Sequence, residues 1–266
     1  MCKTFLPALV ILVLLSACGA TASNPSGEKT IRLAEGVDLL FVRVPAGEFL
    51  MGSSDSDKRA VSYEKPQHKV TLDEYWIGKT EVTNAQYSAY AKANGLRWTM
   101  PAGKENHPVV IVSWDDAVAF CKWVTDVSGR QVRLPTEAEW EKAARGTDGR
   151  VFPWGNDQPT CSLGNFEGCA DKSTAVGSRP AGASPYGALD MAGNALEWVA
   201  DWYDTKYYAN SPSSNPQGPT SGQYRVLRGG TWHQNRNFAR AANRSRLDPS
   251  FRDDWYGFRV ASASVP

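Results

Sequence analysis

Apolar residues recur at helical spacing in two segments near the middle of the chain. Each segment opens with a hydroxyl residue followed three positions later by an acid, the pattern of a capping box (Ser113 with Asp116, Thr136 with Glu139). We therefore predict helices over residues 113–124 and 137–145. A further helix is expected after Thr83, ending near Ala93. The residues expected to face inward in the 137–145 helix are Trp140, Ala143 and Ala144.

Shorter runs that alternate polar and apolar residues indicate strands in the N-terminal third. The expected strands are residues 37–44, a turn and strand within 45–52, 68–72, 75–81 and a short apolar strand at 108–112. From residue 152 to 224 no period is sustained, and proline, glycine, asparagine and tryptophan are frequent. We expect loops held by aromatic packing there, with no internal repeat and no clear second domain.

The C-terminal run, residues 225–260, differs in composition from the rest. It holds eight arginines against three aspartates and no lysine, a net charge of +5. Short strands are expected at its two ends, near 226–227 and 256–260, with an irregular loop between them. Arginine without lysine favours directional hydrogen bonding, as in a binding surface. The alternative is a surface loop whose arginines pair with carboxylates elsewhere in the chain.

The first residues have the features of an export signal. Lys3 precedes an apolar run over residues 5–15 that is too short to span a bilayer comfortably. The segment Leu15-Ser16-Ala17-Cys18 resembles the lipobox of bacterial lipoproteins, which implies cleavage and lipidation at Cys18. The alternative is an ordinary signal peptide with an incidental cysteine. We therefore divide the chain into a signal segment (1–18), a flexible tether (19–35) and one folded domain (36–262).

Charge and cysteines narrow the function. Removal of residues 1–17 takes away Lys3, so 28 basic residues balance 28 acidic ones, which argues against a nucleic-acid binder. Gly19, rather than Asp, follows Cys18, which in a Gram-negative cell implies the outer membrane. Cys161 and Cys169 lie in a loop-like segment, and an oxidising compartment favours a disulfide between them over a metal or redox pair. Cys121 is expected to be buried.

A series of short blocks runs through the chain in order: PAGEFLMG (45–52), EVTN (81–84), VSWDDA (112–117), RLPTEAEWE (133–141), FPWG (152–155), GALDMAGN (187–194), EW (197–198), RGGTW (228–232) and GFR (257–259). Together they resemble the formylglycine-generating enzyme family, also called sulfatase-modifying factors, over about residues 36–262. The resemblance implies an α+β fold, a loop-rich variant of the C-type lectin fold.

The resemblance also implies a chemistry that this chain lacks the residues to perform. Active members oxidise a sulfatase cysteine with copper and oxygen, and they use a pair of cysteines that suits Cu(I). The corresponding positions here are Gln234 and Ala239. An amide and a methyl group do not replace two thiolates, so we expect no copper and assign no catalytic residue. The alternative is an oxidoreductase that matures an exported partner through ligands not recognised in the sequence.

Calcium sites are a further implication of the resemblance. One would correspond to Asp190, Gly193, Ala195 and Glu197, where carboxylates and backbone carbonyls supply oxygen ligands. The alternative for Glu197 is a capping or salt-bridge carboxylate. A second, weaker site would correspond to Asn165, Phe166, Asp171 and Ser173.

A binding role does not require the cysteine pair of the active members. Variable proteins of diversity-generating retroelements share this domain type and bind through the stretch between a GG(S/T)W block and a GFR block, which resembles residues 229–259. Aromatic and adaptable polar side chains suit recognition of a protein or glycan. The candidate ligand-binding residues are Trp232, His233, Gln234, Asn235, Phe238, Asn243, Ser245, Leu247, Phe251, Asp253, Asp254, Trp255 and Tyr256. Alternatively, Trp232, Arg240, Ala241 and Phe258 support the loop from within, or the protein is a structural envelope lipoprotein.

Overall fold

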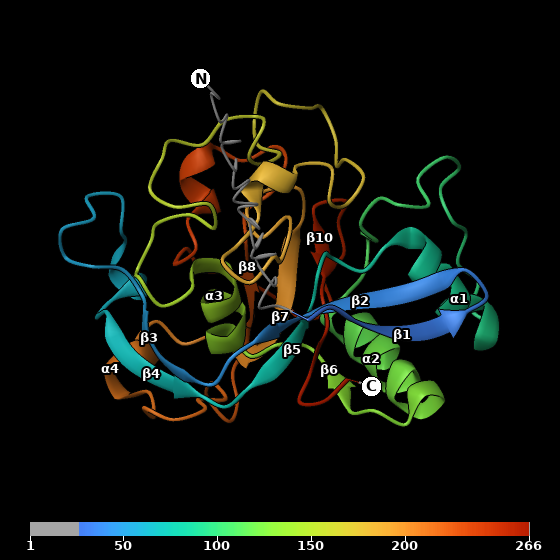
Figure 1. Cartoon of the computed structure of the whole chain (residues 1–266), viewed down its shortest axis with the longest axis horizontal. Helices are drawn as coiled ribbons and strands as arrows, with labels where there is room; N and C mark the ends of the chain where they lie inside the picture. Colours follow the sequence, from blue (N-terminus) through green and yellow to red (C-terminus); the bar gives the residue numbers. More distant parts are fainter. Residues whose placement is uncertain (1–26, 266) are drawn as a thin grey trace, which may run out of the picture.

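The computed structural model describes residues 27–265 (Figure 1). The predicted signal segment with Cys18 lies outside the described residues. The tether predicted over residues 19–35 is too long, because its residues Lys29–Ala34 form strand β1. Ile31 of this strand is 3% exposed and packs in the core, so the strand is held by apolar burial that the polar composition of the segment concealed.

Most strands belong to two sheets, and a separate hairpin completes the set. The five-stranded sheet has the order β1-β2-β5-β11-β6, formed by β1, β2 (Val37–Val44), β5 (Tyr75–Gly78), β11 (Ala261–Ser262) and β6 (Val132–Arg133). The four-stranded sheet has the order β10-β7-β8-β9, formed by β10 (Tyr256–Phe258), β7 (Leu196–Trp202), β8 (Arg225–Arg228) and β9 (Ser245–Leu247). The hairpin pairs β3 (Gly47–Met51) with β4 (His68–Leu72).

The predicted helices are confirmed, with their capping boxes. They are α1 (Asn84–Ala93), α2 (Trp114–Ser128) and α3 (Glu137–Arg145), and a short α4 (Tyr207–Asn210) was not predicted. Single 3-10 turns are η1 (Ser62–Glu64), η2 (Pro180–Gly182) and η3 (Arg236–Ala239). Helix α2 continues past the predicted end to Gly129, which ends it in the left-handed conformation. No helix among residues 27–265 has the length and apolar character needed to cross a bilayer.

Other predictions need correction. Residues 108–112 form no strand and contribute one isolated bridge, Pro108 with Thr83. The strand predicted over 75–81 ends at Gly78. Strand β7 was missed because Leu196–Val199 are all buried, which removes the alternation that marks a one-sided strand. Strand β9 likewise interrupts the loop expected in the C-terminal run.

Helix α3 lies at the centre of the fold, against β3, β7 and β8 (Figure 1). All nine of its residues are buried, and five of them carry charged side chains: Glu137, Glu139, Glu141, Lys142 and Arg145. The Lys142 ammonium group donates to the carbonyls of Pro45 and Gly47 and so fixes the helix to the turn before β3. The charged face of α3 therefore points into the protein, where it needs partners of opposite charge.

Candidate functional site

Two arginines of the C-terminal run supply those partners. Arg228, at 0% exposure, donates to Glu141 at 2.6 Å and to Glu137 at 3.2 Å. Arg244 makes a two-pronged contact with Glu137 at 2.6 and 2.8 Å. These two arginines are buried in the core and do not belong to a binding surface. They pair with distant carboxylates, which is the alternative that the sequence left open.

Arg240 holds the run to the N-terminal third in the same way. Its two terminal nitrogens donate to Glu64 at 2.7 Å each. Asn243 also donates to Glu64, at 3.3 Å, and is 4% exposed. Asn243 was predicted as a ligand-binding residue, but its side chain is buried on the inner side of the run, so it does not belong to the surface.

Five of the aromatic residues predicted for the binding surface contact one another; Phe251 is exposed and the other four rings are partly buried. The His233 ring lies 3.8 Å from the Trp255 ring between centroids, and the Trp232 ring lies 5.3 Å from that of His233. Tyr256 contacts both Trp255 and Phe251 edge-on, at 6.2 and 6.1 Å. We call the surface made by these five aromatic rings the aromatic surface.

The remaining candidates are distributed around it. Phe238 and Phe251 are 44% and 46% exposed, which is high for phenylalanine, and Asn235 is exposed in the turn before η3. Ser245 and Leu247 belong to β9 instead, where Leu247 is partly buried against the core. The structure therefore brings the aromatic candidates together and leaves Ser245 and Leu247 in a sheet strand.

Two neighbouring acids and a strained isoleucine border the aromatic surface. Burial, together with a hydrogen bond and the charge of Asp253, raises the pKa of Asp254. The Asp253 carbonyl accepts from the amide of Ile111, at 2.9 Å. Ile111 is 60% exposed and has φ of 61°, an unusual conformation for a β-branched residue. Sequence reasoning missed Ile111, since no local pattern marks a backbone angle imposed by a distant segment.

The two former thiol positions lie just beneath this surface. Ala239 is 1% exposed and packs with Phe166 and Ala192. The Gln234 carbonyl accepts from the amide of Glu167 at 3.1 Å, while its side-chain Oε1 is buried without a hydrogen-bond partner. Among residues 27–265 the free thiol is that of Cys121, which is buried, and burial raises its pKa. Ala239 thus provides packing and Gln234 an amide at the two positions where active members are expected to have cysteines.

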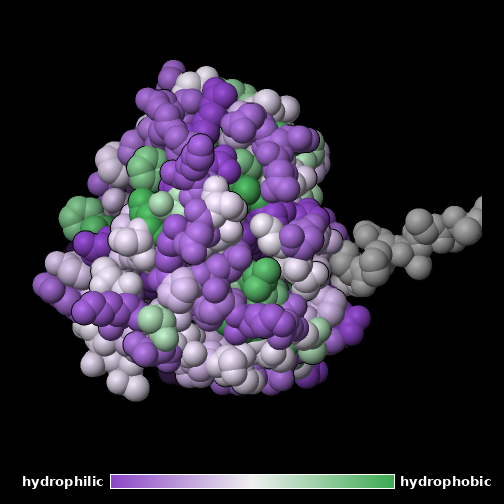
Figure 2. Space-filling model, turned by 90° about the vertical axis from the view of Figure 1, so that its left-hand side faces the viewer, coloured by the Kyte–Doolittle hydropathy of each residue, from purple (hydrophilic) through white to green (hydrophobic). Residues whose placement is uncertain are grey.

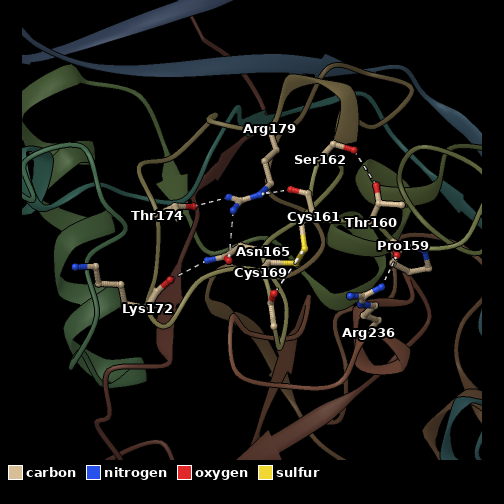
Figure 3. Close-up of a disulfide and its surroundings, with 11 residues drawn as sticks. Pro159, Thr160, Cys161, Ser162, Asn165, Cys169, Lys172, Thr174, Arg179 and Arg236 are labelled. Atoms are coloured by element: carbon tan, nitrogen blue, oxygen red, sulfur yellow. Dashed lines mark hydrogen bonds between the residues drawn. A yellow bond between two sulfur atoms is a disulfide. The ribbon is translucent and has the colours of Figure 1, made fainter.

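The predicted disulfide is confirmed and underlies the same segment (Figure 3). Arg236 of η3 donates to the carbonyl of Pro159 at 3.2 Å, next to Cys161. On the other side of the bridge, Arg179 donates to the Cys161 carbonyl at 2.9 Å and to Thr174 at 2.6 Å. The bridged loop therefore supports η3 and, through it, the C-terminal run.

The residues of the weaker calcium prediction lie in this loop and differ in burial. The Asn165 amide donates to the Lys172 carbonyl at 3.0 Å and so stabilises the loop itself (Figure 3). Asp171 is exposed, whereas Phe166 and Ser173 are buried. The calcium assignment of these four residues stays a prediction.

The first calcium set has a different composition from the one predicted. Glu197 is held by Arg259, with two contacts of 2.6 Å, and by the Trp140 indole at 2.7 Å, so it is a salt-bridge carboxylate. Asp190 lies close to Glu81, a residue that sequence reasoning did not include, and accepts from the amide of Gly177 at 2.5 Å. Gly193 and Ala195 belong to the buried turn between Asp190 and β7.

Charge is unbalanced in this cluster. Glu81, Asp190 and Glu197 lie near the guanidinium groups of Arg259 and Arg179, and the Glu81 Oε2 atom is buried without a hydrogen-bond partner. Burial, followed by the charges of Asp190 and Glu197, raises the pKa of Glu81 well above its ordinary value. No three His, Cys, Asp or Glu side chains in the described part of the chain surround one metal position. The Glu81–Asp190 pair nevertheless fits a cation, because buried carboxylates need one and carbonyls can complete the shell.

A polar pocket of about 590 Å³ opens beside η3. Its walls come from the loop after β3, the end of α3 with the following turn, and the C-terminal run; its lining residues include Lys58, Arg59, Arg145, Asn237 and Arg240. Figure 2 shows the side of the molecule on which residues 53–60 project, and this face is mostly hydrophilic with isolated hydrophobic residues. No prediction from the sequence placed a pocket here.

Comparisons with known proteins agree with this architecture. The family model of the sulfatase-modifying factor enzyme 1-like domain matches residues 37–264. The formylglycine-generating enzyme of Streptomyces coelicolor is 33% identical over 83% of this chain and 88% of its own length. The serine/threonine-protein kinase pkn1 of Chlamydia pneumoniae is 36% identical over 83% of this chain, but over 37% of the kinase.

Two solved structures share the fold closely. PvdO from Pseudomonas aeruginosa superposes with a TM-score of 0.79 at 29% identity, covering 88% of this chain and 98% of PvdO. Treponema denticola variable protein 1 superposes with a TM-score of 0.76 at 25% identity, covering 89% and 99%. These matches confirm the predicted α+β fold of the formylglycine-generating enzyme type. The chain belongs to the sulfatase-modifying factor enzyme 1-like domain family.

Proposed function

We propose that this protein is a membrane-anchored binding protein that recognises a protein or glycan through the aromatic surface and the neighbouring residues of the 231–256 segment. The observation that carries the proposal is the state of the two thiol positions. Gln234 and Ala239 provide an amide and a buried methyl group, while the scaffold around them is complete. A fold that is retained without the reactive cysteine pair supports a binding function over an oxidase function.

The aromatic surface has the properties of a recognition site. Tryptophan, tyrosine and phenylalanine offer large contact areas with few rotamers to freeze, and such residues dominate binding energy at interfaces. The surface is also rigidly supported, since Arg240 and Arg244 anchor the run to Glu64 and Glu137. Preorganisation of this kind lowers the entropic cost of binding.

The likeness to Treponema denticola variable protein 1 supports a variable surface in this position. We propose a retroelement-diversified C-terminal run as one form of this binding function. A reverse transcriptase gene beside a near-copy of the 3′ end of the gene, differing at adenines, is the expected finding; a locus without either element contradicts this form.

The proposed place of action is the cell envelope. The lipobox-like segment ending in Cys18 supports a lipid anchor, in the outer membrane if the cell is Gram-negative. Calcium is the proposed structural ion, and the unbalanced Glu81–Asp190 pair supports it. The neutral mature chain gives no reason to propose a nucleic-acid partner.

An enzymatic role is the second candidate, favoured by the 33% identity to the formylglycine-generating enzyme of Streptomyces coelicolor. Under it the protein would modify an exported partner. Oxygen uptake by the copper-supplemented protein in the presence of a cysteine-containing peptide tests this candidate. Conversion of the peptide thiol to an aldehyde would overturn the binding-only proposal.

The binding proposal is tested with the full chain in detergent micelles, probed against a glycan array and a displayed peptide library. The double variant Phe238→Ala/Phe251→Ala is expected to lose at least about tenfold in affinity for any ligand found, as truncation of interface aromatics does. The matched control is Leu40→Ala/Leu96→Ala, since each of these leucines is 44% exposed and lies in other elements. Equal losses in both double variants would contradict a site on the 231–256 segment.

A further inference from the structure

The buried ion network beneath the polar pocket carries an excess of positive charge. Four guanidinium groups meet three carboxylates there, which leaves one positive charge unbalanced. The arginines are Arg145, Arg228, Arg240 and Arg244, and the acids are Glu64, Glu137 and Glu141. Asp201 does not restore the balance, since burial and the charge of Glu137 raise its pKa to about 8 and keep it protonated at neutral pH.

The pocket wall adds to this excess. Asp57 lies 3.0 Å from Arg59 and 3.8 Å from Arg240, so one carboxylate serves two arginines, and adding Arg59 and Asp57 together leaves the sum unchanged. Lys58 is exposed at the pocket and makes no ion pair or hydrogen bond with any residue between 27 and 265. Two positive charges therefore remain unmatched, one beneath the pocket and one at its rim. In a partly desolvated site such an excess favours a bound anion, because local screening by water is weak.

Neutral polar groups complete the lining. Three hydroxyl groups come from Ser53, Ser54 and Ser56, and side-chain amides come from Gln67, Gln158 and Asn237. Hydroxyls and amides both donate and accept hydrogen bonds, which matches the vicinal hydroxyl groups of a sugar. The volume of about 590 Å³ falls within the range of small-molecule sites. Bulky apolar side chains are rare in the lining, so an apolar ligand does not fit.

We propose that this pocket binds an acidic carbohydrate, with its anionic group toward Lys58 and Arg59 and its hydroxyls toward the serine and amide groups. The anionic group can be a carboxylate or a sulfate, since both accept several charge-assisted hydrogen bonds. The site is separate from the aromatic surface, although Asn237 and Phe238 of η3 belong to the pocket and the outer surface respectively. The proposal therefore stands or falls independently of the function proposed above.

Isothermal titration calorimetry of the full chain in detergent micelles tests it with three probes: a tetragalacturonate, a sulfated heparin-type tetrasaccharide and neutral maltotetraose. At least one acidic probe is expected to bind, more weakly as salt is raised, and maltotetraose is not. Lys58→Gln should weaken binding by roughly fivefold, as loss of an exposed charge partner does. Lys92→Gln is the matched control, because Lys92 is exposed on α1, away from the pocket lining.

The two acidic probes distinguish a carboxylate from a sulfate, and binding of either supports the proposal. Phe251→Ala should leave this binding unchanged, which separates the pocket from the aromatic surface. Three results would overturn the proposal: no binding of either acidic probe, equal binding of maltotetraose, or the same affinity in Lys58→Gln and the unaltered protein.

Discussion

Arg228 illustrates how single buried charges organise this core. Its guanidinium group donates to Glu137 and Glu141 and stands 5.3 Å from the Trp140 ring centroid. A buried guanidinium group stabilises the fold only while its partners stay charged and in place, since a lone buried charge is strongly unfavourable. The protonation states of the acids around α3 therefore enter directly into the stability of the protein.

Asp201 gives this dependence a measurable form. It accepts from the Glu137 amide at 2.7 Å, and burial followed by the charge of Glu137 raises its pKa to about 8. An unfolded aspartate has a pKa of about 3.9. Between these values the folded state keeps a proton that the unfolded state has lost, so the contribution of Asp201 to stability falls as pH rises from about 4 to about 8.

The variant Asp201→Asn keeps a carbonyl acceptor for the Glu137 amide and removes the titration. Its free energy of unfolding in urea is expected to fall less than that of the unaltered protein between about pH 5 and about pH 8. Asp126→Asn, at an exposed carboxylate, is the control. The same pH profile in Asp201→Asn and the unaltered protein would show that Asp201 does not hold the proton.

Residues whose environment is set nearby were predictable, and those set from afar were not. Thr136 and Ser113 were recognised as caps because their partners lie three positions away. Asn243 was placed on the binding surface, but its partner Glu64 is 179 positions away and draws it inward. The same distance explains why the arginines of the run resembled a ligand-binding set.

At the scale of elements, the disulfide-bridged loop and η3 hold each other in place. The Cys161–Cys169 bridge closes a loop in which Phe166 packs on Ala239, and Arg236 donates to the Pro159 carbonyl two residues before that loop. The loop has almost no regular structure of its own. Its order therefore depends on the bridge and on a few specific contacts.

The double variant Cys161→Ser/Cys169→Ser is expected to lose about 2–3 kcal/mol of stability, the loop-entropy contribution of a bridge between residues eight apart. Urea unfolding with and without reductant measures it. Reductant should destabilise the unaltered protein by a similar amount and leave the double variant unchanged. Amides of residues 234–239 should also exchange faster in the double variant. A reductant-insensitive unaltered protein would contradict the prediction.

Elements with local signals were predicted, and those defined by burial on both faces were not. The helices α1 to α3 carry capping boxes, and β3 and β4 alternate in exposure. Strand β7 has no alternation, since both of its faces are covered. The polar pocket escaped prediction for a related reason, because its lining comes from separate segments whose proximity only the fold determines.

At the scale of the whole molecule, charged groups from distant segments meet in two buried clusters. The cluster beneath the pocket has an excess of positive charge. In the cluster of Glu81, Asp190, Glu197 and Arg259, carboxyl groups outnumber their guanidinium partners, and burial raises the pKa of Glu81 and Asp190. Each imbalance is a place where an external ion improves the energy of the folded protein.

For the acidic cluster, calcium is expected to raise the melting temperature, by about 5–10 °C at a hundredfold excess over its dissociation constant. Asp190→Ala and Glu81→Gln should each remove most of that rise, and Glu81→Gln should melt no earlier than the unaltered protein without calcium, since it removes a buried acid. Glu105→Gln, at an exposed position, is the control. Identical melting curves with calcium and with chelator would contradict a site at this pair.

The pairing of early acids with late arginines also dictates when the protein can fold. Glu64, Glu137, Glu141 and Glu197 leave the ribosome well before their partners in the run from Arg228 to Arg259, and β11 enters the sheet between β5 and β6 after all of them. A nascent or truncated polypeptide lacking this run would have to bury glutamates with no counter-charge, which is prohibitive. Completion of the core must therefore wait until the run from Arg228 to Arg259 has been synthesised.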